Sequence, residues 1–223
     1  MMNLWGLIAT IVIFEICKKL KMVRFFSKIP PMMMAGIILI IILCVFKIDY
    51  KSYNESACFL TVLLGPATIA LALPLSDNAK LLTKNKRAVY FGFIIAVTTA
   101  LVTTVVLGHI FHADWKLITS LMPKTVTTPI AIEISKAIGG IPELTACLVC
   151  LTGIYGAMFG HKILKMFKIK SDIATGLSIG ATSHVLGTST CIEKKREKQV
   201  VMATLALIII GVLTTIICVL LFH

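Results

Sequence analysis

Apolar residues fill this chain in long runs that are separated by short polar or charged stretches. The runs cover residues 4–17, 31–48, 57–75, 88–111, 117–138, 144–164, 172–192 and 199–222. A membrane-crossing α-helix needs about 20 predominantly apolar residues. We therefore predict an all-α polytopic membrane protein with about eight membrane segments, organised as a single transmembrane domain over residues 1–223.

Two of these runs are interrupted by polar residues, glycine and proline. Residues 122–133 read MPKTVTTPIAIE, and residues 180–190 read GATSHVLGTST. Irregular backbone at membrane depth is tolerated only where protein or a water-filled cavity satisfies its N–H and C=O groups. Paired breaks of this kind indicate the binding site of a secondary transporter. The run 57–75 contains Gly65-Pro66 and Pro74, so we expect two or three broken or re-entrant helices in all.

The basic residues cluster beside the apolar runs and predict the topology. Seventeen of the 22 Lys and Arg lie in residues 18–28, 80–87, 162–170 and 194–198. Cytoplasmic loops are rich in Lys and Arg, so we place these clusters in the cytoplasm and the N-terminus outside. An even number of crossings must then separate the clusters. Runs 117–138 and 172–192 become re-entrant hairpins from opposite sides, which form an inverted repeat as in secondary transporters.

A second arrangement remains open, in which every run crosses the membrane as a continuous or discontinuous helix. It leaves the cluster 162–170 outside. A weak similarity between residues 68–73 and 128–133 implies a different repeat boundary and favours this arrangement. We prefer the hairpins. In both arrangements the two breaks meet inside the protein.

Composition excludes a soluble globular protein, because 58% of the residues are hydrophobic and the mean hydropathy is +0.97. The net charge of +12 comes from basic residues in short loops beside apolar runs. We expect these residues to orient the protein in the membrane and to contact anionic lipid, and we expect no nucleic-acid partner.

Positive charges follow the first run, which predicts a membrane helix and no signal peptide. Cys147 and Cys150 lie in an apolar run, and we interpret them as small buried residues.

The first break supplies five candidate substrate-binding residues: Lys124, Thr125, Thr127, Thr128 and Pro129. Lys124 can attract an anionic substrate, or it can extend to the membrane surface. Pro129 suits the first turn of a half-helix, whose free N–H groups favour a carboxylate, and the threonine hydroxyls add donors. The alternative for the threonines is ordinary bonding to the backbone around a proline.

The second break supplies four more candidates: Ser183, His184, Gly187 and Thr188. The glycine permits close backbone approach, and His184 can bind a substrate carboxylate or carry a proton. Glu133, about one turn into the half-helix of the first break, is a second proton-coupling candidate. Its alternative is an ion pair with Lys136. We predict that the substrate lies between the two breaks.

Enzymatic chemistry is not expected. Ser183 and His184 are adjacent in the sequence, and adjacent residues rarely bring their reactive atoms together. The chain also has no H-E-x-x-H motif, and its one G-x-S-x-G stretch, residues 176–180, lies within an apolar run. We therefore predict no catalytic residues, no cofactor and no metal site.

Several stretches together resemble the LrgB/CidB family, namely residues 64–75, 123–135, 139–146, 151–154 and 180–188. The resemblance covers essentially the full chain. It implies a multi-pass protein of the bacterial cytoplasmic membrane that works with a small LrgA/CidA-like membrane protein, and we expect a homodimer. Such pairs were first described as antiholin- and holin-like and as controlling murein hydrolase activity and autolysis. Plant relatives in the chloroplast envelope exchange glycolate and glycerate, and some bacterial relatives are linked to pyruvate movement.

Two functions follow from the resemblance. The first is a carrier for small monocarboxylates such as pyruvate, glycolate or glycerate that works by alternating access. The second is an antiholin-like regulator of murein hydrolase activity that acts with the LrgA-type partner. A holin needs only apolar helices that oligomerise, so two polar breaks favour the carrier. Val185, Leu186 and residues 189–191 stand where family members more often have smaller or charged residues, commonly an arginine, which leaves the substrate open.

Overall fold

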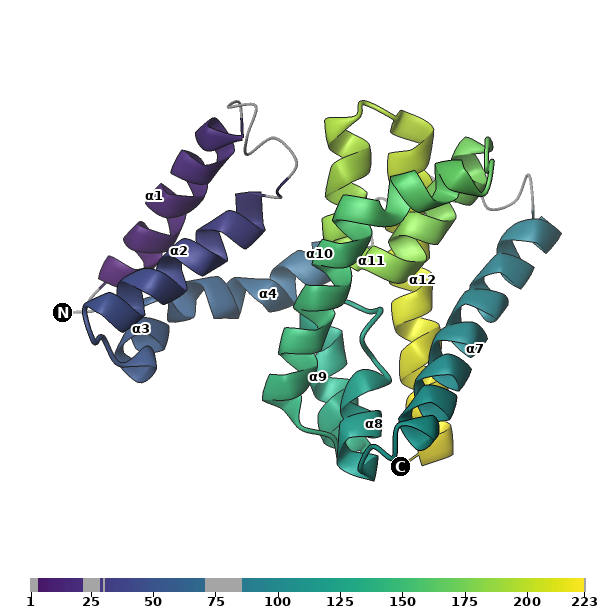
Figure 1. Cartoon of the computed structure of the whole chain (residues 1–223), viewed down its shortest axis with the longest axis horizontal. Coiled ribbons are helices and arrows are strands. Elements are labelled where there is room, and N and C mark those ends of the chain that lie inside the picture. Colours follow the sequence, from purple (N-terminus) through teal and green to yellow (C-terminus); the bar gives the residue numbers. More distant parts are fainter. Residues whose placement is uncertain (1–3, 22–28, 30, 71–85, 223) are drawn as a thin grey trace. The chain divides into compact units, whose positions relative to one another are not determined.

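The computed structural model describes residues 4–21, 29, 31–70 and 86–222 (Figure 1). All regular structure in this part of the chain is α-helical, which confirms the predicted all-α class. The chain divides into two compact units, residues 1–70 and 71–223. The number of membrane segments and the inverted repeat stay predictions.

The first unit consists of α1 (Trp5–Leu20), α2 (Pro31–Val45), α3 (Tyr50–Ser56) and α4 (Cys58–Ala70). Helix α1 packs against α2 around a small core of Cys17, Met34 and Ala35. It is also bonded to α3, because the backbone N–H of Gly6 donates to Ser56 Oγ at 3.1 Å. Helix α4 continues through Pro66, although proline lacks the N–H for the intrahelical bond. Pro74, where a further break is predicted, lies outside the described residues.

The second unit contains α7 (Lys86–Ile110), α8 (Trp115–Leu121), α9 (Thr128–Ala137), α10 (Pro142–Met166), α11 (Asp172–Glu193) and α12 (Glu197–Phe222). Among the described residues, three helices are long and apolar enough to cross a membrane: residues 89–110 of α7, α10 and α12. Their outer faces expose large apolar side chains such as Phe91, Tyr155 and Val212. Such surfaces are stable in contact with lipid, so the protein is a membrane protein.

Helix α11 reverses direction at His184, whose φ of 41° and ψ of −134° are not helical. Gln199 Nε2 donates to Asp172 Oδ1 at 2.7 Å, and Gln199 Oε1 lies 3.1 Å from His161 Nε2. Thr190 Oγ1 lies 3.4 Å from the other ring nitrogen of His161. A straight helix would separate Asp172 and Thr190 by about 27 Å. Because one small network holds both residues, the two ends of α11 lie at the same end of the unit.

The segment from α8 to α9 also folds back, through a non-helical turn at residues 122–127. Ser120 Oγ, near the end of α8, accepts a hydrogen bond from the backbone N–H of Ile141 at 2.8 Å. Thr145 Oγ1 of α10 donates to Ser120 O at 3.0 Å and to Ser135 Oγ of α9 at 2.7 Å. The end of α8 therefore lies beside the start of α10. Both predicted breaks are present.

Basic residues gather where α7 begins, α10 ends and α12 begins (Figure 1). We call Arg87, residues 162–170 and residues 194–198 the basic end of the second unit. Their placement on one side of the membrane stays a prediction. Residues 22–28 and 80–85 of the predicted clusters lie outside the described residues. The ring of Trp115, at the start of α8, lies 6.1 Å from that of Phe222 at the opposite end of α12. The α8–α9 segment and α11 therefore start from opposite ends.

One prediction about burial is wrong. Cys147 and Cys150 are exposed on α10, whereas we expected small buried residues. Helix α10 turns Thr145, Val149 and Gly153 inward, at intervals of four residues, so residues between these positions point outward.

We expect Gln199→Leu to lower the stability of the protein. The variant loses the bonds to Asp172 and His161 that hold the two ends of α11 together. Buried polar groups left without partners cost about 1–3 kcal/mol, or roughly 2–10 °C in Tm for a protein of this size. Thermal unfolding in detergent measures the shift. Glu197→Leu, at an exposed position in the same turn, is the control. Equal Tm values for the two variants would show that the network does not hold α11.

Candidate functional site

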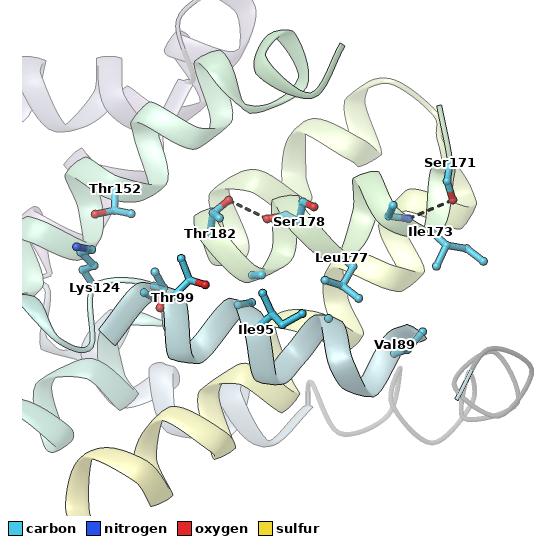
Figure 2. A pocket seen from close by; sticks show the side chains of 16 residues that line it. Val89, Ile95, Thr99, Lys124, Thr152, Ser171, Ile173, Leu177, Ser178 and Thr182 are labelled. Atoms are coloured by element: carbon cyan, nitrogen blue, oxygen red, sulfur yellow. Dashed lines mark hydrogen bonds between the residues drawn. The ribbon is translucent and has the colours of Figure 1, made fainter. Parts of the chain in front are cut away.

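A cavity of about 800 Å³ lies along α7 in the second unit (Figure 2). Its walls come from α7, α10, α11, the residue before α11 and the turn before α9. The lining residues are Val89, Gly92, Ile95, Ala96, Thr99, Ala100, Lys124, Thr125, Thr152, Ser171, Ile173, Ala174, Leu177, Ser178, Ala181 and Thr182. Both interrupted segments contribute, since Lys124 and Thr125 belong to the first break and Ala181 and Thr182 belong to the second.

The cavity is polar at one end and mostly apolar at the other. Lys124, Thr152 and Thr99 lie toward one end, while Val89 and Ile173 lie toward the other (Figure 2). Val89 is near the start of α7 and therefore near the basic end. Thr99 is ten residues further along the helix, or about 15 Å deeper at 1.5 Å per residue. The cavity thus extends from the neighbourhood of the basic end toward the polar turn before α9.

Lys124 is the charged group of this cavity. Its Nζ donates to Thr104 Oγ1 of α7 at 2.7 Å, and Thr104 in turn donates to Ala100 O. The ion pairs found in the described part of the chain are Lys18–Glu15 and Lys136–Glu133, so Lys124 has no carboxylate partner there. An ammonium group within a membrane protein needs a counter-ion or a water-filled cavity. The cavity is therefore suited to an anion at this point.

The other candidates of the first break lie around the start of α9. Thr125 is buried and lines the cavity. Thr127 is the N-cap of α9, yet its Oγ1 is buried and has no hydrogen-bond partner among the described residues. Pro129 stands in the first turn, as the sequence predicts for a half-helix. Of the five predicted residues, the structure thus brings Lys124 and Thr125 to the cavity.

The candidates of the second break hold the reversal of α11 together. His184 Nε2 lies 3.0 Å from Val149 O of α10, and Thr188 Oγ1 donates to His184 O at 3.0 Å. Ser183 faces a smaller hollow of about 240 Å³ between α10 and α11, which shares Thr152, Ser178 and Thr182 with the large cavity. Gly187 packs against Ser183 in the narrow space inside the reversal. None of these four residues lines the large cavity, and their contact with a substrate stays a prediction.

Glu133 is exposed and pairs with Lys136 at 2.8 Å, which is the alternative that the sequence left open. An exposed ion pair three residues apart contributes only a few tenths of a kcal/mol. Glu133 does not line the cavity. Its role as a proton carrier stays a prediction.

Sequence reasoning did not single out several hydroxyl groups at the cavity. Thr152 and Thr182 line it, and both lie in stretches that carry the family resemblance, residues 151–154 and 180–188. Ser178 lies one turn before Thr182, whose hydroxyl donates to Ser178 O at 2.8 Å. That spacing is a usable signal, because residues four apart share a helix face. Thr99 is one of four threonines in α7, and the sequence does not distinguish it from the other three.

Comparison with known proteins gives the family. Residues 10–223 match the LrgB-like family. The antiholin-like protein LrgB of Bacillus subtilis (strain 168) is 30% identical over 214 residues, which cover 96% of this chain and 92% of the relative. The antiholin-like protein LrgB of Bacillus mycoides (strain KBAB4) is 30% identical over 192 residues, or 86% of this chain and 83% of the relative.

A further relative is the uncharacterized protein YxaC of Bacillus subtilis (strain 168). It is 29% identical over 208 residues, which cover 91% of this chain and 90% of the relative. No solved structure matches the chain. The similarity extends over nearly all of the chain, including both breaks and the cavity between α7 and α11. The chain therefore belongs to the LrgB family of membrane proteins.

Proposed function

We propose that this chain is an antiholin-like protein that regulates murein hydrolase activity and autolysis together with a small LrgA/CidA-like membrane protein. The observation that carries this proposal is the nearly full-length similarity to relatives named antiholin-like protein LrgB. These names favour the regulator over the carrier that the sequence analysis preferred. The bacterial cytoplasmic membrane, several membrane crossings and a homodimer belong to the same proposal. Exposed apolar faces on α7, α10 and α12 are compatible with association between membrane helices.

One structural observation supports a second candidate function. Lys124 faces an 800 Å³ cavity and has no carboxylate partner in the described part of the chain. A structural helix bundle has no need of such a cation, which is costly within a membrane. We propose as this second candidate that the protein carries small monocarboxylates by alternating access. Pyruvate, glycolate and glycerate are the acids to test first.

The arrangement in the membrane is part of both candidates. We propose that the α8–α9 segment and α11 are re-entrant hairpins from opposite sides, as in an inverted repeat. The reversal at His184 and the turn at residues 122–127 support this arrangement. Helices α7, α10 and α12 then cross the membrane fully.

The regulator is tested by autolysis. The chain, together with an LrgA-type partner, is produced in a bacterium that lacks its own pair. We expect slower detergent-induced lysis and weaker murein hydrolase bands in a zymogram. Lys124→Gln should keep this effect, because regulation through a partner does not need an anion in the cavity. Unchanged lysis, with the protein present in the membrane by immunoblotting, would rule out the regulator.

The carrier is tested in proteoliposomes with labelled pyruvate, glycolate and glycerate. Hydrogen bonds to charged groups contribute about 1.5–3 kcal/mol, so Lys124→Gln should weaken substrate binding about ten-fold or more. Lys136→Gln is the matched control, since Lys136 lies on α9, is exposed and does not line the cavity. Equal uptake by the two variants would remove Lys124 from the mechanism. No uptake of any carboxylate by the unaltered protein would leave the regulator alone.

The hairpins are tested by labelling single cysteines in a variant without native cysteines. Met166→Cys and Lys195→Cys are at the basic end, and His112→Cys is at the other end. We expect a membrane-impermeant thiol reagent to label position 112 in intact cells and positions 166 and 195 only after permeabilisation. Labelling of position 166 in intact cells would contradict the re-entrant arrangement.

A further inference from the structure

We infer that the cavity beside Lys124 binds an aliphatic monocarboxylate of medium chain length, such as hexanoate or octanoate, in preference to two- and three-carbon acids. This substrate class rests on the carrier candidate and narrows it. The cavity combines one cationic group with a long apolar wall, and that combination is complementary to a carboxylate attached to a hydrocarbon chain.

The polar end of the cavity fits a single anionic group. Lys124 is the one charged residue among those that line it, and Thr125, Thr152 and Thr99 surround this end with hydroxyl groups. A carboxylate there gains a charge-assisted bond from the ammonium group and neutral bonds from the hydroxyls. The lining offers no second cation for another carboxylate on the same molecule. Dicarboxylates are therefore disfavoured.

Most of the remaining wall is built from aliphatic side chains, and Ser171, Ser178 and Thr182 add hydroxyl groups to it. Ile95 and Ala96 of α7 face Ala174 and Leu177 of α11 across the cavity, and Ile173 closes the wall near the basic end. Hydrocarbon gains free energy in such surroundings, because apolar surface is removed from water. The wall therefore offers mostly hydrocarbon contacts, which favour an alkyl chain.

The size of the cavity also favours a medium-chain monocarboxylate. Its volume of about 800 Å³ lies within the range of pockets that hold drug-sized ligands. The stretch of α7 from Val89 to Ala100 that lines it is about 16 Å long at 1.5 Å per residue. A three-carbon acid bound at Lys124 would leave most of the apolar wall without a contact from the ligand. An alkyl chain that runs along α7 from Lys124 would contact this wall.

The experiment measures saturable binding of labelled octanoate to the full chain in nanodiscs, with competition by unlabelled butanoate, hexanoate, octanoate and pyruvate. We expect the affinity to rise about two- to four-fold with each added methylene group. Lys124→Gln should weaken octanoate binding about ten-fold or more, and Lys136→Gln should leave it unchanged. Neutral 1-octanol, which has the same chain without the charge, should compete poorly.

A second variant tests the apolar wall. Ala174→Phe places an aromatic ring in the part of the cavity that the distal end of the chain would occupy. We expect octanoate binding to fall toward the affinity of butanoate, while butanoate binding stays unchanged. Size-exclusion profiles verify that the variant is folded. The chain-length series on the unaltered protein tests the same wall if this variant does not fold.

The outcomes separate the substrate class from the carrier candidate. If pyruvate binds more tightly than octanoate and still needs Lys124, the medium-chain assignment is wrong and the carrier stands. If octanol competes as well as octanoate and the Lys124→Gln variant binds octanoate normally, the cavity recognises only an apolar chain. The medium-chain assignment is then also wrong. If no acid binds saturably, both the assignment and the carrier are wrong.

Discussion

Polar backbone groups at a reversal within an apolar protein must find their hydrogen-bond partners inside that protein. The second unit depends on how this constraint is met at His184. The imidazole of His184 lies within hydrogen-bond distance of Val149 O on α10. The carbonyl oxygen of His184 accepts a hydrogen bond from the hydroxyl of Thr188. At the other end, Asp172, Gln199 and His161 hold the two ends of α11 together. The reversal is therefore fixed at both of its ends.

Small residues make room for this reversal. A side chain at Gly153 or Gly156 of α10 would collide with His184 or Ser183. On the opposite side, a side chain at Gly180 would collide with the backbone of α12 at Ala203. Close approach of helix backbones is the usual way in which membrane helices gain packing energy. The first half of α11 is thereby wedged between α10 and α12, with Ser178, Ala181 and Thr182 at the wall of the cavity.

The sequence was sufficient to locate the two breaks, because glycine, proline and hydroxyl residues are unusual within apolar runs. Pro129 at the start of α9 and the reversal at His184 both lie where these residues predicted breaks. The orientation of each side chain was not accessible in the same way. Successive residues on a helix point about 100° apart, so Thr182 lines the cavity whereas its neighbour Ser183 reaches only the smaller hollow beside it. Packing against α10 decides the rotation, and composition does not encode it.

Two kinds of observation bear on function, and they differ in what they describe. The names of the relatives concern the control of lysis, whereas the cavity with Lys124 concerns the binding of an anion. A regulator that responds to a bound carboxylate would unite them, because α11 both lines the cavity and carries the reversal. Both proposals assume a folded-back α11.

The distance between the two ends of α11 tests this requirement most directly. Spin labels at Ser171→Cys and Lys194→Cys, in a variant without native cysteines, flank the helix, and pulsed electron paramagnetic resonance measures their separation in a bilayer. A continuous helix between these positions would give about 35 Å. The structure predicts a clearly shorter distance, since Asp172 and Thr190 share the network around His161. A single peak near the longer value would contradict the reversal and the cavity built upon it.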